Sequence, residues 1–393
     1  MSEGRLAARA GRIGESATLR VLRRAGELKA QGVDLVDFGA GEPDFHSPPV
    51  AVEAARRALA EGFTRYAPSE GLPRLRQALA ADYERRYGAP WGVQDVLVTV
   101  GGKAALFELA LALFEPGDEV VIPTPAWVSF AEQVRFAGAR PVLVPMDPAE
   151  GFRLRAGPLL AAVTARTKAI LGNSPCNPTG GTWSAADLEQ LVRGCAGAGI
   201  LLVSDETYER FVYDEEPRSA ASWASEFGHH LVVVGSFSKT YAMTGWRIGY
   251  LFGPPDVVRA VSDIQSHDTS NATSFAMVGA LTALEGAEAD VVTMIAEYRW
   301  RRDFLIPRLS ALPGVTCAAP QGAFYAFPAF GGVLRERYPS SNDLATALLE
   351  KAHVAVVPGA AFGADGHLRL SFACSRDELA RGLERLGEFF TRV

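Results

Sequence analysis

Residues 235–249 read Gly-Ser-Phe-Ser-Lys-Thr-Tyr-Ala-Met-Thr-Gly-Trp-Arg-Ile-Gly, and the rest of the chain is interpreted around them. They follow an apolar run, Leu231–Val234, which predicts a buried strand. We expect Lys239 to lie in a loop of small and hydroxylated residues, where desolvation lowers the pKa of its amine and lets it form a Schiff base with a carbonyl. Two hydroxyls and a planar cation that suit a phosphate come from Ser236, Ser238 and Arg247. Taken alone, the stretch fits equally a solvated lysine beside an unrelated arginine.

Composition restricts the class of protein. The chain has 393 residues, of which 48% are hydrophobic and 21% are charged, as in an ordinary globular protein. A net charge of −6 gives no basic footprint for nucleic acid, and no apolar run reaches the ~18 residues of a membrane helix. The four cysteines lie far apart and the histidines form no metal-binding pattern, so we expect no disulfide framework and no metal site. The first twenty residues are Arg-rich, as in an organelle transit peptide. They also contain Glu3 and Glu15 and lack an apolar stretch, so we expect a cytoplasmic protein instead.

Short apolar runs alternate with helical patterns through the middle of the chain. This alternation predicts an α/β fold in which a mostly parallel sheet lies between two layers of helices. The expected strands are 95–100, 119–122, 141–144, 168–171, 200–204, 231–234 and 248–252. In such sheets, ligands bind beyond the carboxyl ends of the strands, so the residues after each strand are the candidates for function.

The pattern changes from about residue 273, where two long helical stretches lead to shorter strands and helices. We expect a large domain at 47–285 and a smaller α+β domain made of 1–46 and 286–393. At 47–62, Ser47, prolines in the first turn and a final glycine predict a helix with a serine cap.

Two of the strand ends carry groups suited to a phosphorylated ring. Gly101-Gly102-Lys103 opens a helix after strand 95–100, and free backbone N–H groups there suit a phosphate. An ordinary strand-to-helix turn explains the same glycines. Trp127 follows strand 119–122 and can stack on a flat ring, or can belong to the core.

Two further strand ends carry polar groups for the edges of such a ring. Asn177 lies in the proline-rich loop after strand 168–171 and can donate to a phenolate-like oxygen, although Asn and Pro also serve turn geometry. Asp205 directly follows strand 200–204. A buried carboxylate at this position needs a cation such as a protonated pyridine nitrogen. Capping the next helix is the alternative role for Asp205. Tyr208 lies within reach of the same loop.

These groups together fit one cofactor. A lysine that binds an aldehyde, phosphate ligands, a ring stacker and partners for the ring nitrogen and ring oxygen each follow a different strand. An aldehyde that also carries a phosphate on a pyridine ring is pyridoxal phosphate.

On these motifs the chain resembles the fold-type I, pyridoxal-phosphate-dependent aminotransferases of the class I/II superfamily, over nearly its whole length. The motifs that carry the resemblance are Ala40-Gly41-Glu42-Pro43-Asp44-Phe45, Tyr66-Ala67-Pro68, Gly101-Gly102-Lys103, Asn177-Pro178-Thr179-Gly180, Ser204-Asp205-Glu206, Ser236-x-Ser238-Lys239-x5-Gly245-x-Arg247-x-Gly249 and Arg369-Leu370-Ser371.

The resemblance implies roles around the cofactor for the matched positions. Lys239 would hold the cofactor covalently and move the proton, Asp205 would face the pyridine nitrogen, and Asn177 with Tyr208 would face the ring oxygen. Trp127 would stack on the ring. The phosphate would be surrounded by Gly102, Lys103, Ser236, Ser238 and Arg247, with Tyr66 reaching it from the other subunit of a homodimer.

The resemblance also implies how an amino acid and a 2-oxo acid are bound. Arg369 would bind the substrate α-carboxylate, assisted by Gly41, Asn177 and the neighbouring Trp127. The bacterial aspartate aminotransferase-like group is the most similar subgroup, because Ser16 and Lys103 resemble its ligands for a side-chain carboxylate. The implied reaction is a ping-pong transamination in amino acid metabolism, with aspartate, glutamate or a related amino acid as donor.

Three alternatives remain at this point. Another reaction of the same cofactor, such as β-elimination, decarboxylation or ring closure, uses the same fold. A nicotinamide dehydrogenase is disfavoured because Gly39-x-Gly41 lacks the third glycine and opens no helix. A sensor that keeps the cofactor without turnover would be expected to carry a DNA-binding segment, and the sequence contains no basic segment of that kind.

Overall fold

A seven-stranded sheet forms the centre of the molecule. The computed structural model describes residues 7, 11, 14, 17–331 and 337–391. The strand order is β2-β8-β7-β6-β5-β3-β4. The strands are β2 (Val96–Thr99), β3 (Glu119–Thr124), β4 (Arg140–Pro145), β5 (Thr167–Asn173), β6 (Leu201–Asp205), β7 (Leu231–Ser236) and β8 (Gly249–Phe252). Neighbouring strands are parallel except for β8, which is antiparallel to both β2 and β7. The expected mostly parallel sheet is confirmed.

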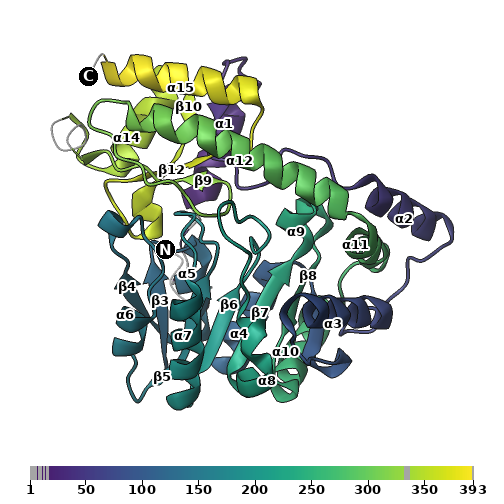
Figure 1. The fold of residues 1–393 in the computed structure, drawn as a ribbon. Coiled ribbons are helices and arrows are strands. Elements are labelled where there is room, and N and C mark those ends of the chain that lie inside the picture. Colours follow the sequence, from purple (N-terminus) through teal and green to yellow (C-terminus); the bar gives the residue numbers. More distant parts are fainter. Residues whose placement is uncertain (1–6, 8–10, 12–13, 15–16, 332–336, 392–393) are drawn as a thin grey trace.

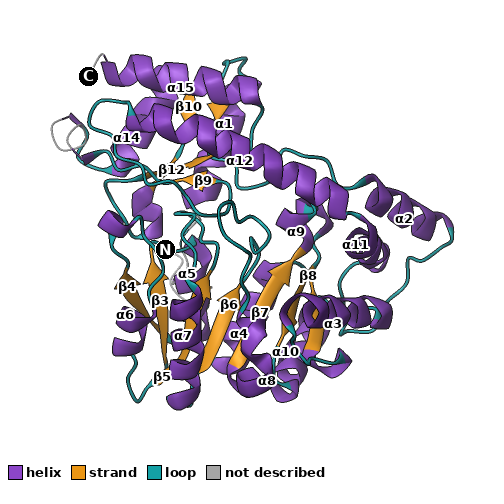
Figure 2. Cartoon of the chain, viewed as in Figure 1, coloured by secondary structure: helices purple, strands orange, loops and turns teal. Residues whose placement is uncertain are grey.

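Helices cover both faces of this sheet. Successive strand residues point to opposite faces, so Leu97 packs in one hydrophobic cluster and Val98 in another. The first face is covered by α4 (Gly102–Leu113), α5 (Val128–Ala137) and α10 (Pro255–Asp268). The second is covered by α3 (Pro73–Tyr87), α6 (Ala156–Ala161), α7 (Ala185–Gly197) and α11 (Ser274–Gly286). Figure 2 shows the resulting layers, which confirm the expected three-layer architecture. At the edge, β4 leaves Leu143 exposed, so this strand is not covered on both faces as its apolar run suggested.

Helix α2 (Pro49–Ala60) packs on α11 at one side of the sheet (Figure 1). The expected serine cap on α2 is wrong, because the helix starts from Pro48 and no side chain caps it. The hydroxyl of Ser47 instead donates to the carbonyl of Ala242 at 2.9 Å and accepts from Nε1 of Trp246 at 3.0 Å. Ser47 therefore ties the start of α2 to the segment that follows Lys239.

A smaller layer of helices and short strands lies over the carboxyl edge of the large sheet (Figure 1). Its antiparallel sheet has the order β11-β12-β9, and a second, parallel pair joins β1 to β10. The strands are β1 (Val36–Asp37), β9 (Tyr325–Ala326), β10 (Val354–Ala355), β11 (Val357–Pro358) and β12 (Leu368–Ser371). The helices are α1 (Ala17–Ala30), α12 (Glu288–Ser310), α14 (Ser341–Ala347, continued by a π-helical turn to Ala352) and α15 (Arg376–Thr391). The division into domains at 46/47 and 285/286 stays a prediction.

The direction of the strands explains where function can be located. Strands β2, β3, β5, β6 and β7 run the same way, so their carboxyl ends meet at one edge of the sheet. Because β8 runs the opposite way, its beginning lies at that same edge, which brings the preceding Arg247 there.

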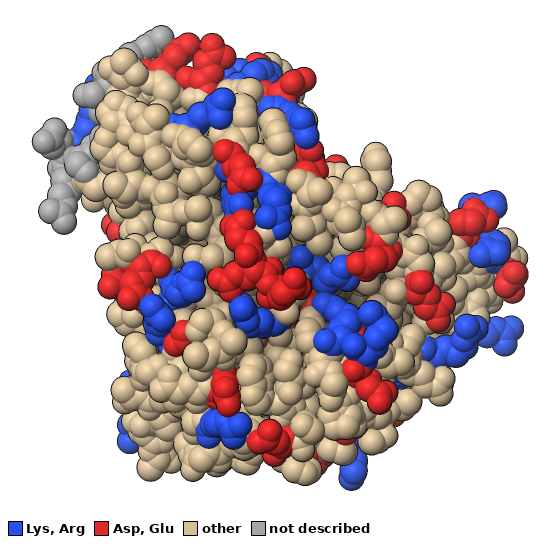
Figure 3. Space-filling model, viewed as in Figure 1, with Lys and Arg blue, Asp and Glu red and all other residues tan. Residues whose placement is uncertain are grey.

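On the face seen in Figure 3, acidic and basic side chains are interspersed. None of the helices within the described residues has both the length and the hydropathy that a membrane crossing requires.

Candidate active site

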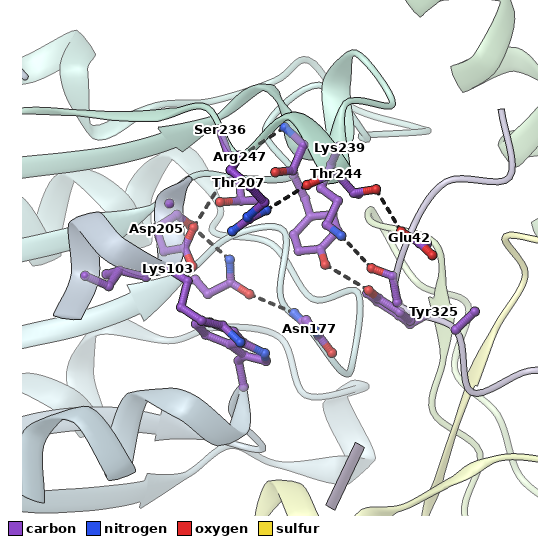
Figure 4. A pocket seen from close by; sticks show the side chains of 18 of the residues that line it. Glu42, Lys103, Asn177, Asp205, Thr207, Ser236, Lys239, Thr244, Arg247 and Tyr325 are labelled. Atoms are coloured by element: carbon purple, nitrogen blue, oxygen red, sulfur yellow. Dashed lines mark hydrogen bonds between the residues drawn. The ribbon is translucent and has the colours of Figure 1, made fainter. Parts of the chain in front are cut away.

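A cavity of about 540 Å³ opens at the carboxyl edge of the large sheet, below the smaller sheet. Its size is typical of a small-molecule site. Four cations and two carboxylates of the described residues line it, so it favours an anionic ligand. The residues that line it include Gly41, Glu42, Gly102, Lys103, Trp127, Asn173, Asn177, Asp205, Thr207, Tyr208, Ser236, Ser238, Lys239, Thr244, Arg247, Tyr325 and Arg369. Figure 4 shows how they converge from several strand ends.

Lys239 lies on the one-turn helix α9 (Phe237–Thr240), so the expectation of a loop is wrong. The turn is helical because the hydroxyl of Ser236 caps it, accepting from the backbone N–H of Ser238 at 3.1 Å. Nζ of Lys239 donates to the carbonyl of Gly41. Burial lowers the pKa of Lys239 to about 8, although the nearby Glu42 carboxylate acts in the opposite direction. The lysine is thereby suited to act as a neutral amine.

The start of α4, α9 and the segment before β8 form a cradle of donors. Gly101 has φ +79° and lies so close to Arg247 that a Cβ there would be 2.5 Å from Nη2. At Gly249 a Cβ would be 2.3 Å from the backbone nitrogen of Gly102, so only glycine lets β8 approach the start of α4. Arg247 is held by a 2.8 Å hydrogen bond from Nη1 to the carbonyl of Thr244. The cradle therefore combines a cation, hydroxyls and a helix N-terminus, which suit a phosphate.

Lys103 and Trp127 form one wall of the cavity. Nζ of Lys103 lies 5.0 Å from the centre of the indole ring, a cation–π contact. Burial and the neighbouring Arg247 lower the pKa of Lys103. Trp127 packs edge-on against Phe130, with ring centres 5.3 Å apart, and is only half-buried, so it belongs to the wall of the cavity more than to the core.

Asp205 is the buried carboxylate at the end of β6. Oδ1 accepts from the backbone N–H of Thr207 at 3.0 Å, a local turn contact in a segment that continues without a helix. Burial raises the pKa of Asp205 to about 6, and the hydrogen bonds from Thr207 oppose this rise. A buried carboxylate that faces a cavity is stabilised by a cationic ligand, as expected for a ring-nitrogen partner.

Arg369 and Asn177 are joined across the two sheets. Arg369 comes from β12, is 1% exposed, and donates from Nη1 to Oδ1 of Asn177 at 3.1 Å and from Nη2 to the carbonyl of Gly39 at 2.8 Å. Its buried Nε has no hydrogen-bond partner among the described residues. A buried cation with an unused donor beside a cavity suits a carboxylate.

Tyr208 and Tyr325 share a hydrogen bond of 2.8 Å between their hydroxyls. Burial, together with Tyr325, raises the pKa of Tyr208 well above its usual range, so the hydroxyl stays protonated. The hydroxyl of Tyr208 can therefore serve as a donor in the cavity.

One candidate residue is not brought to the cavity, and the structure does not describe another. Tyr66 is 89% exposed and does not line the cavity of its own chain. Ser16, like Glu15, lies outside the described residues. Every other candidate cofactor or substrate residue, including Lys239, Asp205 and Arg369, lines this one cavity.

Sequence reasoning assigned no role to several residues of the site. Tyr325 lies in a short apolar strand with no motif around it, and Thr244 is separated from its partner Glu42 by about two hundred residues. The Thr244 hydroxyl donates to Oε2 of Glu42 at 2.7 Å, a contact visible in Figure 4. Asn173 and Thr207 stand directly at strand ends, so their position was the signal that could have identified them.

Comparison with known proteins agrees with this geometry. The model of the family "Aminotransferase class I and II" matches residues 33–386. The aspartate/prephenate aminotransferase of Thermus thermophilus is 45% identical over 384 residues, covering 96% of this chain and 97% of the relative. The aspartate aminotransferase of Geobacillus stearothermophilus is 42% identical, covering 98% of each chain. The solved structure of the Thermus thermophilus aspartate aminotransferase with maleate has a TM-score of 0.93 at 44% identity, covering 98% of this chain and 99% of that one.

These matches span nearly the whole chain, and the resemblance seen in its motifs is confirmed. Members of this family depend on pyridoxal phosphate. With a lysine, a buried carboxylate and a buried arginine around one cavity, the chain belongs to the class I and II aminotransferases and is a transaminase of the aspartate aminotransferase-like group.

Proposed function

We propose that the chain binds pyridoxal phosphate in this cavity and transfers the amino group of aspartate, or a closely related amino acid, to a 2-oxo acid. One observation carries the proposal. The amine of Lys239, the carboxylate of Asp205 and the guanidinium of Arg369 all open on a single cavity that is also lined by Gly102, Ser236, Ser238 and Arg247 of the donor cradle. Few other ligands need an amine, a carboxylate and two anion sites at once.

The residues present fit this cofactor. The phosphate would lie at the start of α4, held by the backbone of Gly102, the hydroxyls of Ser236 and Ser238, and Arg247. The glycine supports this, because a Cβ at Gly102 would lie 3.4 Å from Oγ1 of Thr207 and 3.6 Å from Cβ of Ser236 and would thus occupy part of the cradle. Lys103 adds positive charge beside the cradle.

The ring would lie between these groups and the substrate side. Trp127 would stack on it, Asp205 would pair with its nitrogen, and Asn177 and Tyr208 would face its oxygen. When bound, the cofactor supplies an electron sink for the Cα–H bond of the substrate. Lys239 would hold it covalently, because its buried amine opens on the cavity and has a lowered pKa.

The protein's own residues supply the remaining steps. The neutral amine of Lys239 would take the proton from Cα of the amino acid and would be the group that returns a proton. Asp205 would favour a protonated ring nitrogen, because a buried carboxylate favours a cation beside it. Arg369 orients the α-carboxylate by a forked contact, with the Gly41 backbone and Asn177 beside it. The second half-reaction repeats these roles with a 2-oxo acid, which gives ping-pong kinetics.

The proposed donor follows from Lys103 and from the relatives. Lys103 places a cation in the same cavity as Arg369, so a dicarboxylate can be bound at both ends. The two named relatives are an aspartate/prephenate aminotransferase and an aspartate aminotransferase, and the structure from Thermus thermophilus contains maleate, a dicarboxylate. Ser16 is proposed as a further ligand of the side-chain carboxylate.

We further propose a homodimer in which Tyr66 completes the cavity of the other subunit. Tyr66 and three apolar side chains on or near α2, namely Val52, Leu59 and Phe63, are exposed in the single chain. An exposed apolar face of this kind favours association, and two-fold dimers are common. We propose 47–285 as the cofactor-binding domain, 1–46 with 286–393 as the small domain, and the cytoplasm as location.

The test is a donor and acceptor screen on the purified holoenzyme. The expected result is oxaloacetate formed from aspartate at the expense of 2-oxoglutarate, with kcat/KM for aspartate at least tenfold above alanine. In Lys103→Met this preference should fall by about tenfold, since one carboxylate contact is lost. Pyruvate and ammonia released without an acceptor would instead support β-elimination, the alternative that the relatives do not favour.

A further inference from the structure

Asn173 is a buried side chain of the cavity for which the proposed reaction has no role. It is the last residue of β5, is 4% exposed, and lies opposite Asp205 in the register of β5 and β6. Both ends of its amide are engaged. Nδ2 donates to the carbonyl of Asp205 at 3.0 Å, and Oδ1 accepts from the backbone N–H of Asn177 at 2.8 Å. One side chain therefore connects the residue proposed for the ring nitrogen with the residue proposed for the ring oxygen.

The connection continues to the substrate side of the cavity. The other face of Asn177 receives the hydrogen bond from Arg369, whose second nitrogen bonds to Gly39. A chain of four hydrogen bonds thus runs from Asp205 through Asn173, Asn177 and Arg369 to Gly39. Because these groups are buried, each bond is costly to lose and restricts the position of the next.

The two bonds of Asn173 are not equally replaceable. The Asp205 carbonyl also accepts from the backbone N–H of Ser174 at 3.1 Å, so it keeps a partner without Asn173. The backbone N–H of Asn177 has Asn173 as its acceptor, and that N–H lies in a buried loop. Loss of the Asn173 amide therefore releases the Asn177 end of the chain.

We propose that Asn173 is a positioning residue that fixes Asn177 relative to Asp205, and thereby sets both the ring-oxygen contact and the orientation of Arg369. The proposal rests on the function proposed above. A simpler role, anchoring the loop 174–178 for stability alone, explains the two bonds but predicts no change in the cavity.

The consequence differs from that of a structural anchor. A donor that faces an ionised ring oxygen stabilises the ionised form, so its displacement raises the pH at which that oxygen loses its proton. A displaced Asn177 also removes a partner of Arg369, which loosens the fork that binds a carboxylate. The two effects should appear together although they occur at different groups.

The test compares Asn173→Ala with Ser174→Ala in the holoenzyme. Ser174 is a matched control, because its buried hydroxyl anchors the same loop by accepting from the N–H of Trp183 at 3.3 Å and does not line the cavity. Two quantities are measured: the pH midpoint of the visible absorption change of the bound cofactor, and the Kd for maleate. In N173A the midpoint should rise by about one pH unit and the Kd should increase about tenfold. In S174A the Kd for maleate should remain within about twofold of the wild-type value, and the pH midpoint should remain within about 0.2 pH unit of it.

A milder variant and a structure keep the proposal falsifiable. Asn173→Ser retains an oxygen near Asn177 and should give intermediate values, which carries the test if N173A does not fold. Folded variants in which both quantities equal those of S174A would overturn the positioning role. A wild type that shows no cofactor absorption would defeat the proposed function instead. A crystal structure of N173A without cofactor then tests the positioning of Asn177 separately. If the backbone nitrogen of Asn177 keeps its wild-type position in that structure, the positioning role of Asn173 is contradicted.

Discussion

Nη1 of Arg369 and Oδ1 of Asn177 are joined by a hydrogen bond of 3.1 Å, which links the small antiparallel sheet to the loop after β5 of the large sheet. The guanidinium also lies 4.5 Å above the ring of Tyr325. Burial lowers the pKa of Arg369, because desolvation disfavours the charged guanidinium. Nε of Arg369 has no hydrogen-bond partner in the part of the chain that the structure describes, and a carboxylate bound in the cavity would provide one.

Replacement of this guanidinium tests its role directly. Arg369→Lys keeps the charge but loses the planar fork that can contact a carboxylate twice while holding Asn177 and Gly39. We expect kcat/KM for aspartate to fall by about 100-fold, or about 3 kcal/mol, while the absorption of the bound cofactor is retained. An equal loss of cofactor binding would mean that the substitution disrupts the cavity as a whole.

Glu42 should control the pH dependence of Lys239. The Glu42 carboxylate raises the pKa of the lysine, and burial holds that pKa at about 8. In the half-reaction that begins with a free Lys239 amine, the rate should rise with pH through about 8, because only the neutral amine accepts a proton. Glu42→Gln removes the negative charge, stabilises the neutral amine, and should move this limb to lower pH.

The control for that prediction is Thr244→Val. It removes the 2.7 Å hydrogen bond to Glu42 but keeps the carboxylate charge. Its pH limb should stay close to that of the wild type. A limb that moves equally in both variants would assign the effect to the hydrogen bond, and not to the charge.

Asp205 should destabilise the protein when no cofactor is bound. Burial raises its pKa from 3.8 to about 6, so the folded state resists ionisation. The cost is small below about pH 4, grows between about pH 4 and pH 6, where the unfolded chain loses the proton before the folded one, and is complete above about pH 6. Asp205→Asn should therefore raise the unfolding free energy of the apoprotein by up to about 3 kcal/mol at pH 8.

Urea unfolding of the apoprotein at pH 4 and pH 8 checks this prediction. The stabilisation should disappear at the lower pH. In the holoenzyme the same variant should lose activity by at least about 100-fold, because the neutral amide does not hold a protonated pyridine nitrogen. Equal unfolding free energies of the wild-type and D205N apoproteins at pH 8 would contradict the prediction, because they would mean that the Asp205 carboxylate does not destabilise the folded apoprotein.

Tyr66 should act in the cavity of the other subunit. Tyr66→Ala and Lys239→Ala are each expected to be impaired, the second completely. When the two are unfolded together and reassembled, a hybrid dimer contains one site with both substitutions and one with neither. About a quarter of all sites should then be wild type, with activity to match. Failure of the mixture to recover activity would place Tyr66 outside the shared site.

The sequence predicted the large sheet because each strand is a distinct apolar run and the chemistry follows directly at strand ends. Asp205, Asn177 and Lys239 were all identified from that position. Strand β8 was also predicted, but its antiparallel direction was not, since an apolar run does not encode direction. That direction is what brings Arg247 to the phosphate cradle.

The sequence did not predict features that depend on contacts between distant segments. Ser47 resembles a helix cap by its neighbours, but Trp246 and Ala242 bind its hydroxyl. The turn of α9 is too short to show a helical period, so Lys239 was expected in a loop. Tyr325 and Thr244 acquire their roles only when the smaller sheet and the segment around Glu42 fold over the cavity.

The most direct test of the central claim is the location of the covalent bond to the cofactor. The holoenzyme is treated with borohydride, digested and mapped by mass spectrometry, with and without prior addition of aspartate. The account predicts that pyridoxal phosphate is found on the peptide containing Lys239, and that aspartate releases it before reduction. Labelling of Lys103, labelling spread over surface lysines, or a label on Lys239 that aspartate does not remove would contradict the account.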